Sequence, residues 1–174
     1  MSNDTTNKKY NKISYRIEEI GTMLKDKVVD SMIDFKSETE TIVNSTSIED
    51  IRSLMPKKYI DFNKAISQLG GKLLYIKSGS TGHTFKGVYP QLDSHKPNYG
   101  VKVVAYPKKE HYGDMYNVKR PENAELLMIK ILSYFVKKKQ TPHIVLPITT
   151  FNTSIKPFLN LSKDNIVNNK KYDT

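Results

Sequence analysis

The chain has 174 residues, a formal net charge of +10 at pH 7, and neither cysteine nor tryptophan. This length allows one domain of ordinary size with its own core, and the absence of cysteine excludes a disulfide framework and thiolate chemistry. No apolar run approaches the ~20 residues that a membrane span needs, and the polar N-terminus does not resemble a signal peptide. The lysines are dispersed without interleaved aromatic residues, which argues against nucleic-acid binding. We expect a soluble intracellular protein.

A helical extension is predicted over residues 13–71, after a disordered tail over residues 1–12, where periodic apolar positions are lacking. From Ile13 to Phe35, apolar residues recur every three or four positions, which predicts one helix with a single apolar face. That face would consist of Ile13, Ile17, Ile20, Leu24, Val28 and Met32. Such a helix packs on its own domain or binds a partner protein, and the pattern alone leaves both open.

Two shorter helices are expected in the second half of the extension, after a polar linker. Ser47 can cap a helix that ends at Pro56, because its hydroxyl can accept from the first turn. A second helix is predicted over residues 57–69, and Gly70 and Gly71 would end it with a left-handed cap. Its apolar side would consist of Tyr59, Phe62, Ile66 and Leu69.

Residues 73–89 have the pattern of a strand, a short flexible loop and a second strand. The loop runs from Ser78 to Gly82, and its small residues would let backbone N–H groups approach a bulky anion such as phosphate. A third strand is predicted over residues 99–105. It carries Lys102 among apolar residues, where an ammonium group is costly to desolvate without an anionic partner.

The loop resembles that of the nucleotide-binding N-terminal lobe of protein kinases, whose signature is G-x-G-x-x-G-x-V followed by a strand reading V-A-I-K. Gly79 and Gly82 match the second and third glycines of the signature, whereas Lys77 stands in place of the first. Thr84 replaces the valine that covers the adenine in the family. Lys102 matches the lysine of the strand motif.

The helix predicted over residues 120–136 extends the resemblance, because its apolar residues recur at helical spacing. In kinases the corresponding helix supplies a glutamate that pairs with the strand lysine and holds it against the α- and β-phosphates. The resemblance implies Glu125 in this role, with Glu122 as the alternative. From the residues alone, a strand lysine can also extend to the surface, and a glutamate at a helix start can serve the helix dipole only.

The fold class that follows is α+β: a kinase N-lobe-like antiparallel sheet with one long helix over residues 72–151, preceded by the helical extension. Residues 143–148 resemble the start of the fourth strand of the family, and residues 152–174 are expected to form a polar tail without a further strand. The four histidines lack the spacing of metal ligands, so no metal site is predicted. The implied nucleotide-binding residues are Ser78, Gly79, Ser80, Thr81, Gly82, Thr84, Lys102 and Glu125.

The motifs H-R-D, D-F-G and A-P-E do not occur in the 174 residues. In kinases, H-R-D supplies the catalytic base and D-F-G a magnesium ligand. We therefore predict a truncated kinase without activity of its own. The alternatives are a non-catalytic pseudokinase-like binding module and a β-hairpin domain unrelated to kinases. The composition and residues 141–148 resemble serine/threonine protein kinases of giant DNA viruses, which implies the host cytoplasm or the virion. Weakly bound ATP, magnesium only in a full-length parent, and a missing catalytic lobe or another protein partner are implied as well.

Overall fold

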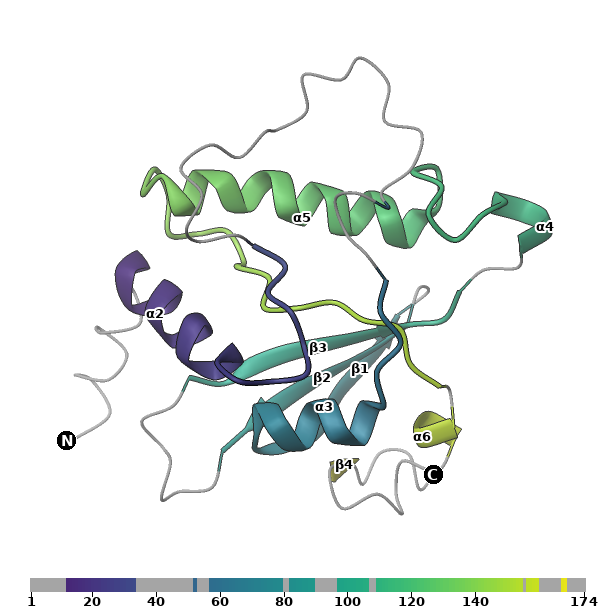
Figure 1. Ribbon diagram of the computed structural model, residues 1–174, viewed down its shortest axis with the longest axis horizontal. Helices are drawn as coiled ribbons and strands as arrows, with labels where there is room; N and C mark the ends of the chain where they lie inside the picture. The colour runs from purple at the N-terminus through teal and green to yellow at the C-terminus, as the bar shows by residue number, and fades with distance from the viewer. Residues whose placement is uncertain are drawn as a thin grey trace. The chain divides into compact units, whose positions relative to one another are not determined.

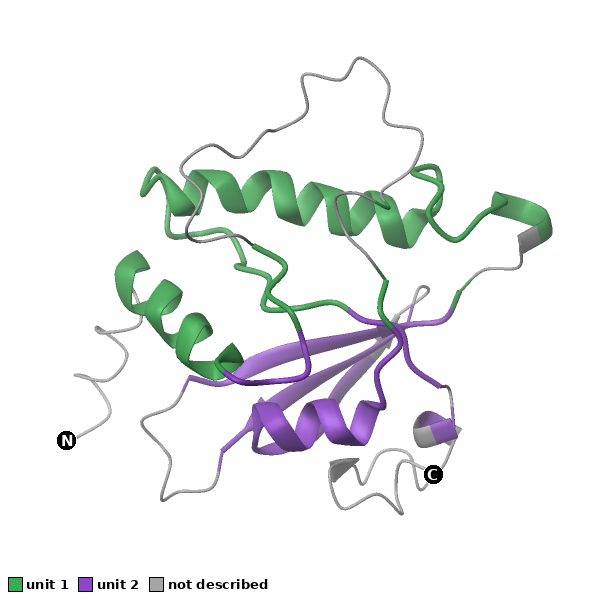
Figure 2. Ribbon diagram, viewed as in Figure 1, with its two compact units in different colours: residues 1–25, 30–58, 106–150 green, residues 26–29, 59–105, 151–174 purple. Residues whose placement is uncertain are grey.

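The computed structural model describes residues 12–33, 52, 57–79, 82–89, 97–106, 109–154, 156–159 and 167–168. The chain divides into two compact units, each assembled from separate stretches (Figure 2). Unit 1 consists of residues 1–25, 30–58 and 106–150, and unit 2 of residues 26–29, 59–105 and 151–174. The division of the chain into consecutive domains stays a prediction.

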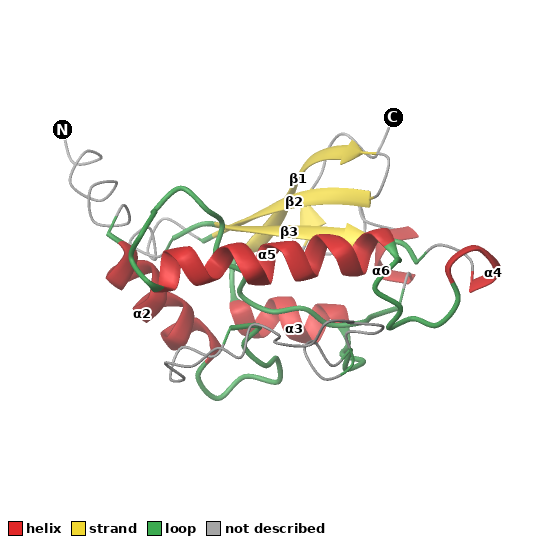
Figure 3. Cartoon of the chain, turned by 90° about the horizontal axis from the view of Figure 1, so that it is seen from above, coloured by secondary structure: helices red, strands yellow, loops and turns green. Residues whose placement is uncertain are grey.

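Unit 2 contains a four-stranded sheet in the order β3-β2-β1-β4. The first three strands can be followed in Figure 1. The strands β1 (Lys72–Gly79), β2 (Gly82–Val88) and β3 (Tyr99–Val104) pair antiparallel and lie side by side (Figure 3). This confirms the predicted strand, loop, strand and third strand. β4 (Val167–Asn168) adds to the free edge of β1 in parallel. The prediction of no strand in the last residues is therefore wrong, because two residues paired at an edge leave no periodic signal.

A bulge in β1 follows Tyr75. Tyr75 lies opposite Phe85 of β2, but the next opposed pair is Lys77 with Thr84, so Ile76 is an extra residue in the ladder. Because side chains alternate between the two faces of a strand, one extra residue moves every later side chain to the other face. Lys77 consequently shares a face with Thr84, opposite to the face of Tyr75.

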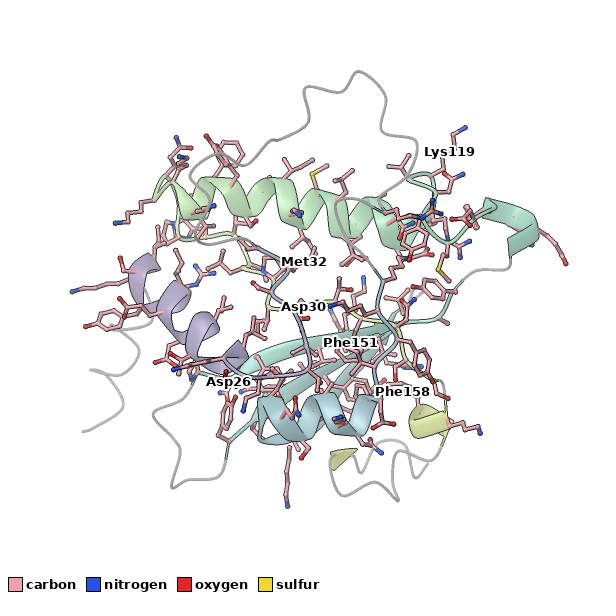
Figure 4. All side chains as sticks on the ribbon, in the orientation of Figure 1. Asp26, Asp30, Met32, Lys119, Phe151 and Phe158 are labelled. Carbon is pink, nitrogen blue, oxygen red and sulfur yellow. The ribbon has the colours of Figure 1, made fainter. Side chains whose placement is uncertain are left out.

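The face of the sheet that carries Phe85 is buried by α3 (Phe62–Leu69) and α6 (Lys156–Leu159). Phe158 of α6 lies between the two layers: its ring centroid is 4.6 Å from that of Phe62 and 6.4 Å from that of Phe85 (Figure 4). Phe62 and Phe85 are almost fully buried. These aromatic rings form the core of unit 2, together with Ala65, Ile66, Leu69, Leu73 and Tyr99.

The helix α3 begins at Phe62 rather than at residue 57, so the predicted start was wrong. Asp61 caps the helix by accepting a hydrogen bond of 2.8 Å from the Lys64 N–H. Before the cap, Tyr59 forms a β-bridge with Asn152 and its side chain is exposed, so it takes no part in the buried face. The chain is extended there because a distant segment binds its backbone.

Two glycines end α3 as the sequence indicates. Gly70 and Gly71 have φ angles of 86° and 87°, which favour glycine over residues with a side chain. The hydroxyl groups of Tyr89 and Tyr99 donate to the carbonyls of Leu69 and Gly70 at 2.8 and 2.7 Å. These two hydrogen bonds join the end of α3 to Tyr89, which follows β2, and to Tyr99, the first residue of β3.

Unit 1 contains α2 (Ile13–Leu24), α4 (Lys109–Tyr112) and α5 (Pro121–Lys137). The long helix α5 confirms the prediction for residues 120–136, and Pro121 occupies its first turn. Its buried side chains share a core with α2 and with two extended segments. That core consists of Ile20, Ile33, Val136 and Leu146, with Ile13, Ile17, Leu24, Ile144 and Ile148 packed against it.

The prediction of one helix from Ile13 to Phe35 is wrong, because α2 ends at Leu24. Asp26 has a positive φ of 57°, which interrupts helical geometry, and the described residues 27–33 that follow contain no helix. The Met32 N–H donates to the Ile148 carbonyl at 3.1 Å, which joins the backbones of two distant stretches of unit 1. Of the predicted apolar face, Met32 is buried but Val28 is only half-buried. Val29 and Ile33, which the helical face does not include, are buried more deeply than either, so the helical periodicity is wrong here. The helix predicted after Ser47 lies outside the described residues, apart from residue 52.

Residues 143–148 do not form a strand, so the expected fourth strand is wrong. Arg16 of α2 donates to the carbonyls of Pro142 and Ile144 at 2.7 and 2.8 Å. Partial burial lowers the pKa of the Arg16 guanidinium. Backbone acceptors that a sheet would pair are bound here by a side chain instead. Within the described residues, no helix combines the length and the apolar character that crossing a membrane requires.

Candidate functional site

The predicted phosphate loop is the turn between β1 and β2. Gly79 and Gly82 form the last pair of the β1–β2 ladder, and Ser78 lies opposite His83, so two residues separate the paired strand ends in the sequence. Ser80 and Thr81 lie outside the described residues. The hairpin is confirmed, whereas phosphate binding by its loop stays a prediction.

Gly82 has a packing reason to be glycine. A Cβ atom at this position would lie 2.0 Å from the Val103 carbonyl oxygen of β3, closer than any real contact. The hairpin therefore needs this glycine for its own fold, whether or not an anion binds. Gly100, which takes the alanine position of the family motif, differs, because nothing lies within 4 Å of a Cβ placed there.

A row of three residues crosses the sheet next to this turn. Lys102 of β3 lies directly opposite Thr84 of β2, and Thr84 lies opposite Lys77 of β1. Directly opposed residues point to the same face of a sheet, so the three side chains share one face. We call Lys77, Thr84 and Lys102 the lysine row. Both lysines are exposed and Thr84 is half-buried.

The face that carries the lysine row is basic. In the next row of this face, Lys86 lies between Leu74 and Gly100, and Lys72 occupies the row beyond it. None of the residues in β1, β2 and β3 is Asp or Glu. Four lysines without an acid in the same strands make this face attractive to an anion.

Glu125, the predicted partner of Lys102, lies in α5 and is half-buried. It belongs to unit 1, whereas Lys102 belongs to unit 2, and their pairing stays a prediction. Glu122, the alternative partner, is buried within unit 1, where it accepts a hydrogen bond of 2.6 Å from Arg120 Nε. Because the carboxylate of Glu122 is bound by Arg120, Glu125 is the better candidate.

A buried polar cluster at the start of α5 is absent from the sequence prediction. Arg120 is 2% exposed and donates to the Gly113 carbonyl at 3.1 Å in addition to Glu122. Asn123 is fully buried, and its Nδ2 donates to the carbonyls of Met115 and Asn117 at 2.9 and 2.8 Å. The signal in the sequence is a pattern of polar or charged residues on both sides of the helix-start proline, at positions 120, 122 and 123. The cluster fixes the turn that precedes α5.

Lys57 joins this cluster from a separate stretch of unit 1. Its Nζ donates to the Met115 carbonyl at 3.0 Å and lies 4.5 Å from the centroid of the Tyr106 ring. Burial lowers the pKa of the Lys57 ammonium, an effect that Glu122 opposes and Arg120 reinforces. The cluster is therefore an anchor for the first turn of α5, one turn before Glu125.

Among the described residues, no group of three or more His, Cys, Asp or Glu side chains could hold a metal ion. Magnesium binding, which we expect for a full-length parent, stays a prediction. Of the predicted site residues, the register brings Gly79, Gly82, Thr84 and Lys102 to one end of the sheet, whereas Glu125 lies in unit 1.

The chain is similar to a protein of Acanthamoeba polyphaga mimivirus that carries the provisional name of a serine/threonine-protein kinase. The two are 42% identical over 147 residues, which cover 84% of this chain and 29% of the viral protein. The chain thus spans less than a third of that relative's length. No protein-family model matches the chain, and no solved structure matches it either. The resemblance to serine/threonine protein kinases of giant DNA viruses is confirmed by this similarity.

Proposed function

We propose that this chain is the ATP-binding N-terminal lobe of a serine/threonine protein kinase. The observation that carries the proposal is the register of the sheet, which puts Lys102 opposite Thr84, two residues after the glycine that closes the hairpin. Lys102 therefore lies close to the end of the sheet at which β1 and β2 are joined, which supports a site that combines its charge with backbone donors of the turn. The similarity to a viral protein with a kinase name supports the same function.

Each residue of the proposed site would have a separate task. Backbone N–H groups of residues 78–82 would bind phosphate oxygens, and Thr84 would cover the adenine beside Gly100. The Lys102 ammonium would bind the α- and β-phosphates, and Glu125 would hold that ammonium in place. Magnesium would be held by the nucleotide phosphates and by a catalytic lobe, whose ligand motifs are not among these 174 residues.

Without H-R-D and D-F-G motifs, we expect no phosphotransferase activity from this chain by itself. A catalytic lobe or another protein partner would complete the enzyme, in the host cytoplasm or the virion. The alternative function is a pseudokinase-like module that binds nucleotide without turnover, which Lys77 in place of the first glycine favours. An assay with labelled ATP and a generic protein substrate tests activity: turnover that disappears in Lys102→Met would show that these 174 residues are sufficient.

Titration calorimetry with ATP and magnesium tests the binding function. We expect a dissociation constant on the order of millimolar, which corresponds to a binding free energy of about 4 kcal/mol. Binding should be weak because Lys102 is exposed, and contacts between exposed charges contribute little. Lys102→Met should weaken binding further, whereas Lys64→Met, which removes the same charge from α3, should not. Equal affinities for ATP in wild type and Lys102→Met would show that Lys102 does not bind ATP. No binding by the wild type would refute the proposed function.

A further inference from the structure

The bulge in β1 decides where the side chain of Lys77 points. Leu73 and Tyr75 face the core with Gly87 and Phe85, and strict alternation would send residue 77 to that same face. The extra residue after Tyr75 reverses the alternation, and Lys77 lies opposite Thr84 instead. Bulges often serve to redirect a side chain beside a functional site. Here the result is an exposed lysine on the face of Lys102.

The two lysines of the lysine row are close enough for their side chains to reach one anion. Neighbouring strands are about 4.8 Å apart, so the Cα atoms of Lys77 and Lys102, two strands apart, are separated by roughly 10 Å. Each lysine has a flexible four-carbon stem with a compact ammonium group, so both ammonium groups can extend past the row and converge on one anion at the turn end of the sheet. The three strands contribute no carboxylate that would compete for these ammonium groups.

We propose that Lys77 is a second phosphate-binding lysine, and that the lysine row makes the site select nucleotides by their number of phosphates. This inference rests on the proposed function, because it concerns the same site. A glycine at this position offers a backbone donor but no charge, so the contribution of Lys77 is a property of this chain. Triphosphates should bind more tightly than diphosphates, and diphosphates more tightly than monophosphates. The alternative is a solvated surface lysine with no more effect than any other.

The test compares Lys77→Ala, Lys77→Arg and the matched control Lys64→Ala in the full chain. Lys64 is exposed on α3, which packs against the other face of the sheet, so its removal changes the net charge equally without touching the row. Affinities for ATP, ADP, AMP and inorganic tripolyphosphate are measured by ligand-induced NMR shifts, which suit weak binding. Lys77→Ala should weaken ATP and tripolyphosphate about fivefold, as expected for one exposed charge contact, and AMP by much less. Lys77→Arg should retain the affinity.

The outcomes separate this inference from the proposed function. If wild type binds ATP and Lys77→Ala binds it equally well, or no worse than Lys64→Ala does, the inference is wrong and the proposed function stands. If Lys77→Ala lowers the affinities for AMP and for ATP by the same factor, the inference that the site selects nucleotides by phosphate number is wrong. If tripolyphosphate binds through Lys77 and ATP binds no more tightly than tripolyphosphate, the phosphate-binding role of the lysine row is supported and the nucleotide-binding function is refuted. Failure of wild type to bind either ligand overturns both.

Discussion

At the scale of single residues, Gly87 and Tyr99 depend on each other. A Cβ atom on Gly87 would lie 2.3 Å from the Tyr99 ring, whereas a Cβ atom on Gly100, the next residue of β3, would meet nothing within 4 Å. We expect Gly87→Ala to displace the ring and to lower the free energy of unfolding by about 1–3 kcal/mol. Gly100→Ala should be neutral or slightly stabilising. Urea unfolding of both variants measures the difference, and equal stabilities would contradict the close packing.

The ionisation of Tyr99 predicts how stability changes in alkali. Burial, and then the neighbouring Tyr89, raises the pKa of the Tyr99 phenol above its ordinary value. A group whose folded pKa is raised contributes stability that is complete below the unfolded pKa of about 10 and is lost as the pH rises toward the folded pKa. We therefore expect the free energy of unfolding to fall above about pH 10, and less steeply in Tyr99→Phe. Parallel slopes in the two proteins would contradict this assignment.

At the scale of one element, the start of α5 separates a structural carboxylate from a proposed functional one. Glu122 is 7% exposed and bound to Arg120, which is itself 2% exposed. Glu122→Gln would leave the Arg120 charge buried without its partner, which typically destabilises by about 3–5 kcal/mol. Glu125→Gln should leave the unfolding midpoint nearly unchanged and weaken ATP binding instead.

The two variants are compared by thermal melts and by ATP titration on the same preparations. A loss of stability in Glu125→Gln equal to that in Glu122→Gln would assign both residues to packing. Normal ATP affinity in Glu125→Gln, with weakened affinity in a folded Glu122→Gln, would exchange their roles. The comparison therefore tests the choice between the two glutamates independently of any kinase activity.

At the scale of the whole molecule, the net charge of +10 should make salt act on stability and binding with opposite signs. Repulsion among the excess positive charges destabilises the compact state, and salt screens it over a Debye length of about 3 Å at 1 M. Raising the ionic strength should therefore raise the melting temperature while it weakens ATP binding. A melting temperature that falls with added sodium chloride would show that attractive ion pairs outweigh the net repulsion.

The sequence by itself determined the elements whose signal is local. Strand-forming residues on either side of Gly79 and Gly82 determined the hairpin, and the spacing of apolar residues determined α5 and the buried face of α3. Lys102 could be assigned to a strand, and the kinase resemblance could be recognised, because both depend on short motifs. Each of these features can be recognised within one short segment, because the spacing of its residues along the chain carries the signal.

The tertiary structure alone decided the features that depend on two distant segments. The face of Lys77 follows from a bulge, which is a mismatch between β1 and β2 and is not encoded by either strand alone. The Arg16 side chain and the Met32 N–H donate to carbonyls of residues 142, 144 and 148, which explains why that later segment is not paired in a sheet. The Arg120–Glu122 ion pair could not be predicted from the sequence, because the sequence does not show that both side chains are buried. Register and long-range hydrogen bonds are properties of pairs of segments, and periodicity within one segment carries no information about them.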